Sequence, residues 1–227
     1  MIAKALCIIM ASYSYAMMLL PPKSARSVWT SKTDKIKKEA SFSTTPYYPY
    51  TMTALTSLWA ALYLVLMIWP AVVKPESRQL RELKTWQVAM TILSVASYLL
   101  RTWSFRTLDW FFTYQLTIRP GHRLVTSGPY KILRHPSYTG FFFNGAAVWT
   151  LLWHNDISSL LPVLTYSNMM GWLGVNGGLL VAAGLSWMTA MQIMWRVAAE
   201  EEMLKGHFGK EWDIYSSKRW RFIPYIY

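Results

Sequence analysis

Two segments of the chain carry polar residues whose types and spacing are suited to chemistry. One extends from His122 to Tyr138 and reads HRLVTSGPYKILRHPSY; the other extends from Arg196 to Pro224 and begins RVAAEEEMLKGHFGKEW. We find no hydrolase-like triad in them. We therefore expect them to bind and position ligands.

The first segment combines a turn with the start of a helix. Residues 127–129, Ser-Gly-Pro, predict a tight turn, and Pro136 is expected in the first turn of a helix that continues through Ser137 and Tyr138. Backbone amides at a helix start favour an anionic group such as a carboxylate. The alternative is a capped interfacial loop in which Tyr and His are amphipathic anchors, and the residues alone leave both open.

In the second segment, Arg196 and Glu200 are four residues apart and share one face of a helix. A partly desolvated guanidinium can hold a substrate carboxylate by a two-pronged hydrogen bond, and a neighbouring carboxylate can accept from ribose hydroxyls or a ligand ammonium. The alternative is an ordinary ion pair worth about 0.3–0.5 kcal/mol, with Glu201 and Glu202 merely solvated.

The composition indicates that these segments belong to a membrane protein. Hydrophobic residues make up 53% of the 227 residues and charged residues only 15%, against a soluble average of roughly 25%. The net charge of +12 comes from Lys and Arg in short loops and not from one basic face, so we expect no nucleic-acid partner. The single cysteine, Cys7, excludes a disulfide framework and a cysteine-based metal site, and we expect no metal.

Stretches of mostly apolar residues predict an all-α polytopic bundle of about five transmembrane helices. The first stretch resembles a signal peptide in position, but it lacks a clear cleavage site and we expect a retained helix. We expect one domain, 1–227, in which 1–114 holds N-terminal helices and a mobile linker and 115–227 forms the catalytic, cofactor-binding half. The stretches are Ile2 to Leu20, Met52 to Val73, Trp86 to Leu100, Tyr138 to Trp153 and Gly171 to Trp195.

The distribution of Lys and Arg predicts the orientation of the bundle. The loops from Pro21 to Thr51 and from Phe105 to Pro136 are basic, whereas His154 to Met170 contains no Lys or Arg. Because cytosolic loops carry the excess of positive charge, we expect both basic loops and the C-terminal tail in the cytosol. One loop disagrees, since it would be lumenal and contains Lys74, Arg78, Arg81 and Lys84.

Two features of the last spans have structural and functional interpretations. Four glycines predict notches for a neighbouring helix or a lipid tail, namely Gly171, Gly174, Gly178 and Gly184. A set of aromatic and Met residues either faces lipid, as we favour, or lines an entry path for a lipid substrate. These are Phe141, Phe142, Phe143, Trp187, Met188 and Met191.

The two polar segments together resemble the isoprenylcysteine carboxyl methyltransferase family. The family's H-x-L-V-T-x-G-P-Y-x-x-x-R-H-P-x-Y-x-G stretch is complete here from His122 to Gly140. The resemblance extends from about Gln115 to the end of the chain. The second motif is present as Glu201, Glu202, Leu204, Phe208, Gly209, Trp212 and Tyr215, ending in Ile223 and Pro224.

This resemblance implies an S-adenosylmethionine-dependent carboxyl O-methyltransferase of the endoplasmic reticulum membrane, whose cofactor pocket is built from cytosolic loops and the C-terminal helix. The acceptor would be a prenylcysteine or another lipophilic carboxylic acid. Arg196 would be the catalytic, substrate-binding residue. The residues implied to contact S-adenosylmethionine are Gln115, His122, Arg123, Leu124, Val125, Tyr130, His135, Pro136, Ser137, Tyr138 and Glu200.

Three other classes stay open at this point. A phospholipid amine N-methyltransferase uses the same donor, but it must deprotonate an ammonium, which Arg196 would oppose. A sterol-type membrane reductase would bind NADPH through a similar C-terminal plan, and a non-enzymatic scaffold would bind neither cofactor.

Overall fold

The computed structural model describes residues 1–20, 48–68, 82–113, 116, 118–154 and 177–226. Over these residues the chain is helical, and its one β-bridge joins Leu133 to Trp220, so the predicted all-α class is confirmed. The helices are α1 (Ile2–Leu19), α3 (Tyr48–Ile68), α5 (Thr85–Leu108), α6 (Pro136–Trp153), α8 (Gly177–Phe208) and α9 (Lys210–Ser217), with short 3-10 turns η5 (Asp109–Phe111) and η6 (Gly128–Lys131).

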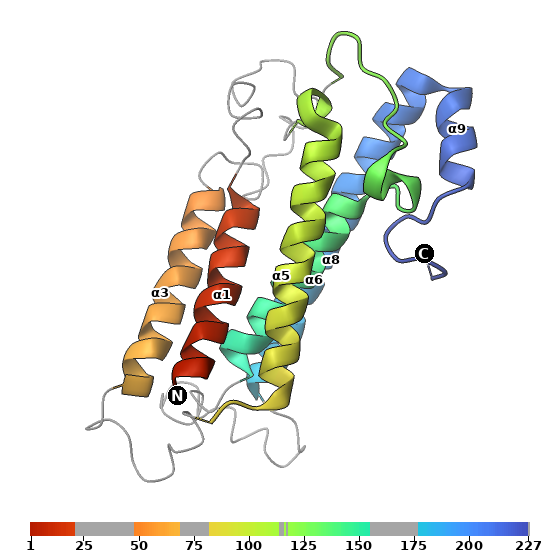
Figure 1. Cartoon of the computed structure of the whole chain (residues 1–227). Helices are drawn as coiled ribbons and strands as arrows, with labels where there is room; N and C mark the ends of the chain where they lie inside the picture. Colours follow the sequence, from red (N-terminus) through yellow and green to blue (C-terminus); the bar gives the residue numbers. More distant parts are fainter. Residues whose placement is uncertain (21–47, 69–81, 114–115, 117, 155–176, 227) are drawn as a thin grey trace.

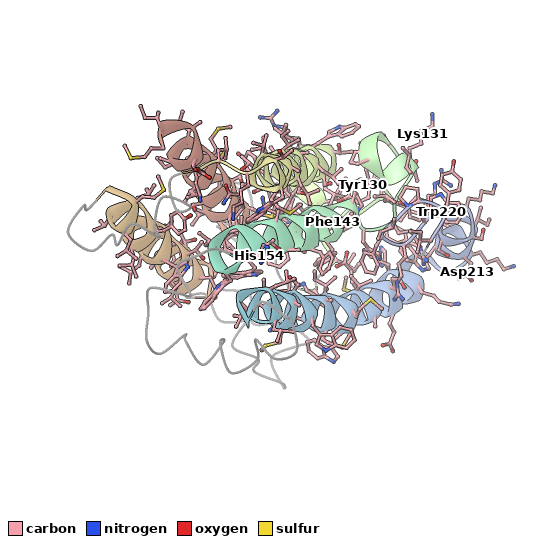
Figure 2. All side chains as sticks on the ribbon, turned by 90° about the horizontal axis from the view of Figure 1, so that it is seen from below. Tyr130, Lys131, Phe143, His154, Asp213 and Trp220 are labelled. Atoms are coloured by element: carbon pink, nitrogen blue, oxygen red, sulfur yellow. The ribbon has the colours of Figure 1, made fainter. Side chains whose placement is uncertain are left out.

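The long helices lie side by side in one bundle (Figure 1). Helix α1 packs against α3, α5 and α6, and α6 lies between α5 and α8, as the view along the bundle also shows (Figure 2). Apolar side chains of α1, α3 and α6 form the core, where burial of hydrocarbon stabilises the packing. This core consists of Ile8, Ala11, Tyr15, Leu19, Ala60, Tyr63, Met67, Val148, Leu151 and Leu152.

The chain is an integral membrane protein, because four of its described helices are long and apolar enough to cross a bilayer. They are Ile2–Leu19, Pro49–Met67, Thr85–Phe111 and Gly178–Phe208. Helix α6 corresponds to the remaining predicted span and has 18 residues. Its polar side chains make it less apolar than the four helices above, so it is not among the candidate spans. A fifth span therefore stays a prediction.

Two helices extend further than the apolar stretches predicted. Helix α5 continues past Leu100 to Leu108, which places Arg101 inside it. Helix α8 continues past Trp195 to Phe208, so Arg196 and Glu200 lie on one continuous helix with the preceding apolar residues. Hydropathy marks where a helix leaves the apolar layer, whereas backbone hydrogen bonding continues beyond it.

One end of the bundle gathers the C-terminal ends of α5 and α8, the start of α6, helix α9 and the C-terminal tail (Figure 1). The segment before α6 and the C-terminal tail, which we expect on the same side of the membrane, both lie at this end of the bundle. Which side of a membrane this end faces stays a prediction. The predicted linker up to residue 47 and the disagreeing basic positions 74, 78 and 81 lie outside the described residues.

The closest approach of two described helices at a glycine occurs on α6 and not at the predicted positions of α8. A Cβ added to Gly140 would lie 2.6 Å from the Ser97 carbonyl oxygen of α5 and 3.2 Å from the Arg101 Cβ. Gly184 faces open space, so the close approach of a neighbouring helix predicted there is wrong, and room for a lipid tail stays a prediction. Positions 171 and 174 lie outside the described residues. The sequence shows where the glycines of a span lie, but it does not show which face of that span packs against a neighbouring helix.

A buried polar cluster fixes α1, α5 and α6 relative to one another. Ser14 and Ser94 place their hydroxyl oxygens 2.6 Å apart. The side-chain amide of Asn144 donates to the Ser14 hydroxyl at 3.1 Å and to the Ser94 carbonyl at 2.7 Å. Such bonds between membrane helices specify which faces meet.

Candidate functional site

A cavity of about 250 Å³ opens at the end of the bundle where α5, α6 and α8 meet the segment that precedes η6. Its apolar wall includes Phe111, Phe141, Ile193 and Trp195. Both motif segments contribute to it, although many residues separate them in sequence. The predicted site residues that line the cavity are His122, Arg123, Leu124, Val125, Tyr130, His135, Ser137, Tyr138, Arg196 and Glu200.

One described site residue of the prediction, Pro136, does not line this cavity. Pro136 is fully buried at the start of α6, where its ring occupies the first helical turn and leaves no amide unsatisfied. Position 115 lies outside the described residues. The prediction for Gln115 is therefore untested.

His122 lies against aromatic rings at the mouth of the cavity. Its ring centroid is 4.9 Å from that of Phe111 and 5.7 Å from that of Phe208. Burial, followed by the charges of His207 and Arg119, lowers the pKa of His122. The imidazole is therefore neutral at neutral pH, and it does not repel a cationic ligand.

The predicted turn before the helix is confirmed. Gly128 has a φ of +56°, a left-handed conformation that glycine adopts without steric cost. The Tyr130 amide donates to the Ser127 carbonyl at 3.1 Å. Burial, followed by the negative charge of Glu200, raises the pKa of Tyr130 well above its usual value, so this phenol stays protonated.

The two backbone amides that precede α6 are bonded to the C-terminal tail. The Arg134 amide donates to the Trp220 carbonyl at 2.7 Å, and the His135 amide donates to the Arg221 carbonyl at 3.2 Å. The C-terminal tail thus occupies both donors. The expectation of an anion at the amides of the helix start stays a prediction, because the two occupied amides precede Pro136, where α6 begins.

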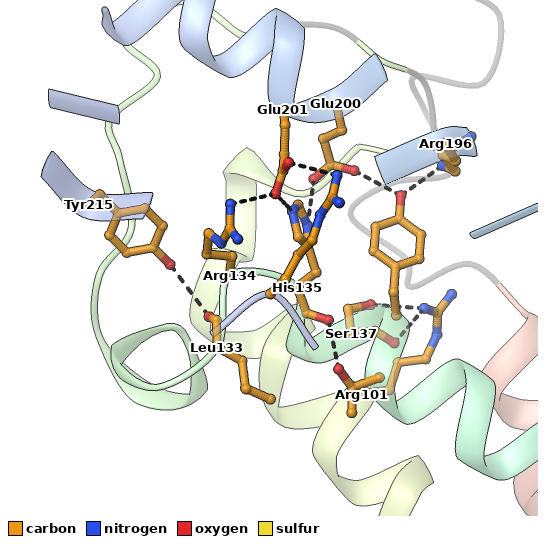
Figure 3. Close-up of polar contacts among 12 residues, drawn as sticks. Arg101, Leu133, Arg134, His135, Ser137, Arg196, Glu200, Glu201 and Tyr215 are labelled. Carbon is orange, nitrogen blue, oxygen red and sulfur yellow. Dashed lines mark hydrogen bonds and ion pairs between the residues drawn. The ribbon is translucent and has the colours of Figure 1, made fainter. Parts of the chain in front are cut away.

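Arg196 and Glu200 share a face of α8 (Figure 3), and Tyr138 of α6 is hydrogen-bonded to both. The Arg196 Nε donates to the Tyr138 hydroxyl oxygen at 2.8 Å. That hydroxyl donates to the Glu200 Oε2, also at 2.8 Å. Because one phenol serves both charged groups, the three side chains act as a single unit on the cavity wall.

Glu201 is half-buried between two arginines and His135 and is not merely solvated. Its Oε1 accepts from Arg134 Nη1 at 3.0 Å and from His135 Nε2 at 2.9 Å, and its Oε2 lies 2.8 Å from Arg221 Nη2 (Figure 3). The alternative in which Glu201 is solvated is therefore wrong, whereas Glu202 is exposed as that alternative expected. The Glu-Glu pair of the motif marks this position, but only the fold brings the three cations to it.

Arg101 is a cavity residue that the sequence analysis missed. Its Nη1 donates to the Ser137 hydroxyl at 2.8 Å and its Nε donates to the Met18 carbonyl at 3.3 Å. Its guanidinium also lies 4.6 Å from the Phe105 ring centroid and 5.0 Å from that of Phe141. Among the described residues no carboxylate pairs with it. An Arg inside an apolar helix is itself a signal of a functional or packing role.

Most of the aromatic and Met residues named for an entry path face away from the cavity. Trp187, Met188 and Met191 are exposed on α8, in agreement with the favoured lipid-facing interpretation. Phe142 and Phe143 pack on each other, with ring centroids 5.4 Å apart. Of this set only Phe141 lines the cavity.

Comparison with known proteins finds one family that part of the chain resembles. Residues 89–172 match the sequence model of the isoprenylcysteine carboxyl methyltransferase (ICMT) family, a range that contains the first motif and ends before Arg196. A protein-S-isoprenylcysteine O-methyltransferase of Dictyostelium discoideum is 29% identical over 150 residues, which make up 65% of this chain and 53% of that protein. The chain thus spans about half the length of this curated relative. Through residues 89–172 and the motif they contain, the chain is similar to the isoprenylcysteine carboxyl methyltransferase family.

Proposed function

We propose that the protein transfers a methyl group from S-adenosylmethionine to the carboxylate of a prenylcysteine or another lipophilic acid. The observation that supports this most directly is that Arg196 and Glu200 of α8 line one cavity together with His135 and Tyr138 of the family's first motif. In this proposal residues 115–227 form the catalytic half, and residues 1–114 complete the bundle around it.

The residues of the cavity fit the methyl donor. S-adenosylmethionine combines ribose hydroxyls, an ammonium and a carboxylate, and its sulfonium supplies the methyl group. Glu200 Oε2 accepts from Tyr138, while Oε1 lies 3.9 Å from His135 Nδ1 and can accept from a hydroxyl or an ammonium. Neutral His122 and protonated Tyr130 provide hydrogen bonds without adding positive charge next to a sulfonium.

Arg196 is the residue that fits the acceptor carboxylate. A guanidinium has five N–H donors, so a bond from its Nε to Tyr138 is compatible with a two-pronged bond from its other nitrogens to a carboxylate. The acceptor acid has an unperturbed pKa of about 4 and is ionised at neutral pH, so no general base is needed. Arg196 acts by orientation and electrostatic stabilisation.

The apolar wall fits the lipid part of the acceptor. Leu19 of α1 and Trp195 of α8 line the cavity, and both belong to helices that can cross a bilayer. We propose that α6 is the fifth span, since it lies between α5 and α8 and its polar side chains point into neighbours rather than lipid. The cavity would then face the cytosol at the surface of the endoplasmic reticulum.

Guanidinium groups on the cavity wall favour an anionic acceptor over an amine. Arg101 and Arg196 both line the cavity, and positive charge opposes binding of a phospholipid ammonium and its deprotonation. The phospholipid amine N-methyltransferase is therefore only the second candidate.

The proposal is tested with purified protein in lipid nanodiscs. Isothermal titration with S-adenosylmethionine and with NADPH separates a methyltransferase from a reductase. Radiolabelled donor is then supplied with a prenylcysteine, a terpenoid acid or phosphatidylethanolamine, and base-labile methyl ester is counted. Binding of NADPH alone, or of neither cofactor, would refute the proposal; label in the phospholipid would favour the second candidate.

Single substitutions assign the roles within the cavity. We expect Arg196→Ala to abolish ester formation while much of the donor binding remains, and Glu200→Ala to weaken donor binding. The matched control is Glu211→Ala, at an exposed position of α9. Near-normal turnover of Arg196→Ala would exclude its role in holding the acceptor.

A further inference from the structure

The Glu201 carboxylate joins three parts of the chain that are distant in sequence. It lies on α8 and contacts Arg134 and His135 before α6 and Arg221 in the C-terminal tail, each at 3.0 Å or less. Its side chain is 18% exposed, so water competes weakly for these bonds. Partly buried, charge-assisted hydrogen bonds of this length hold their groups in one geometry.

One of these contacts sets the state of His135. The His135 ring is almost fully buried, and its Nε2 lies 2.9 Å from Glu201 Oε1. An ionised carboxylate only accepts hydrogen bonds, so Nε2 carries a hydrogen. The opposite ring nitrogen, Nδ1, is directed toward Glu200, with Oε1 at 3.9 Å. Glu201 thereby decides which nitrogen of His135 faces the cavity.

The tail contacts the same short segment through its backbone. Carbonyls of Trp220 and Arg221 accept from the amides of Arg134 and His135, and the Thr139 hydroxyl donates to the Phe222 carbonyl at 2.9 Å. If the tail were released, these donors would lose their partners at the start of α6. The side chain of Arg221 and the tail backbone therefore support the same two cavity residues.

We propose that Glu201 is a positioning residue that couples docking of the C-terminal tail to assembly of the cofactor pocket. It fastens the tail through Arg221 and, with the same carboxylate, holds His135 with a hydrogen on Nε2 and with Nδ1 toward the cavity. The tail then docks and the cofactor pocket assembles in the same step. The proposal rests on the proposed function for its binding measurement, but not for its measurement of the tail.

The experiment uses the full chain in nanodiscs and two independent readouts. The variants are Glu201→Gln and Arg221→Ala, and their matched controls are Glu211→Gln and Lys218→Ala, at exposed positions. Hydrogen–deuterium exchange of the peptide covering residues 132–140 reports release of the tail. Titration with S-adenosylhomocysteine reports the pocket.

We expect both variants to raise exchange in residues 132–140, with exchange in α1 and α5 unchanged, and to raise the Kd by about tenfold or more, because small displacements of binding groups are costly. Both controls should match the wild type, and Arg221→Lys should restore part of the affinity. If exchange were unchanged, or if it rose while the Kd stayed the same, the coupling would be excluded. If the wild type did not bind the nucleoside at all, the proposed function would fail, and the exchange result would still decide the tail contact. Should Glu201→Gln not fold, Arg221→Ala decides both readouts.

Discussion

The hydroxyl of Tyr138 is the smallest group whose removal tests the organisation of the site. Tyr138→Phe keeps the ring but deletes the bond from Arg196 Nε and the bond to Glu200 Oε2, both of 2.8 Å. A hydrogen bond to a charged group contributes about 1.5–3 kcal/mol. The Glu200 side chain is 27% exposed, so water replaces part of what is lost. We therefore expect a net effect of about 1–2 kcal/mol, or roughly 5- to 30-fold.

The assay for this prediction is the kcat/KM for ester formation with a prenylcysteine acceptor. Tyr138→Phe should lower kcat/KM by the stated factor, and the effect of Glu200→Gln should be smaller in the Tyr138→Phe background than alone, since both remove the same bond. Tyr13→Phe is the control, because this phenol is 62% exposed on α1. A Tyr138→Phe enzyme within twofold of the wild type would mean that the hydroxyl does not organise Arg196 and Glu200.

Three further outcomes follow from the packing and from the titration of the site. Gly140→Ala places a Cβ 2.6 Å from the Ser97 carbonyl oxygen, so we expect a loss of roughly 1–3 kcal/mol, seen as a lower Tm in detergent, whereas Gly184→Ala should leave the Tm unchanged. Because the pKa of His122 is lower in the folded state than in the unfolded state, the unfolded state takes up a proton at higher pH. The stability should therefore fall as the pH drops below about 6.5, and it should fall less in His122→Gln. Equal pH profiles of Tm for the two proteins would contradict this. Arg101→Leu removes the bonds to Ser137 and Met18, and we expect a loss of roughly 1.5–3 kcal/mol in a denaturant titration; unchanged stability would exclude Arg101 as a brace between helices.

The sequence determined the helical class, the membrane character and the two polar segments that contribute to the cavity. Apolar stretches identify spans because a backbone in hydrocarbon must satisfy its own hydrogen bonds, whichever helices pack against it. The motif from His122 to Gly140 could be found in the sequence because its residues follow one another along the chain. The four-residue spacing of Arg196 and Glu200 also sufficed to place both on one face of a helix.

Contacts between distant segments were decided only by the tertiary structure. The three partners of Glu201 could not be found from the sequence, because they lie before α6 and in the tail and no local spacing connects them to Glu201. The same holds for Gly140, whose neighbour is Ser97 of α5, and for the amides that the tail occupies. Periodicity along a chain describes one helix at a time, whereas packing between helices depends on which faces meet. The sequence therefore identified the groups that do chemistry, and the fold decided which charges hold them in place.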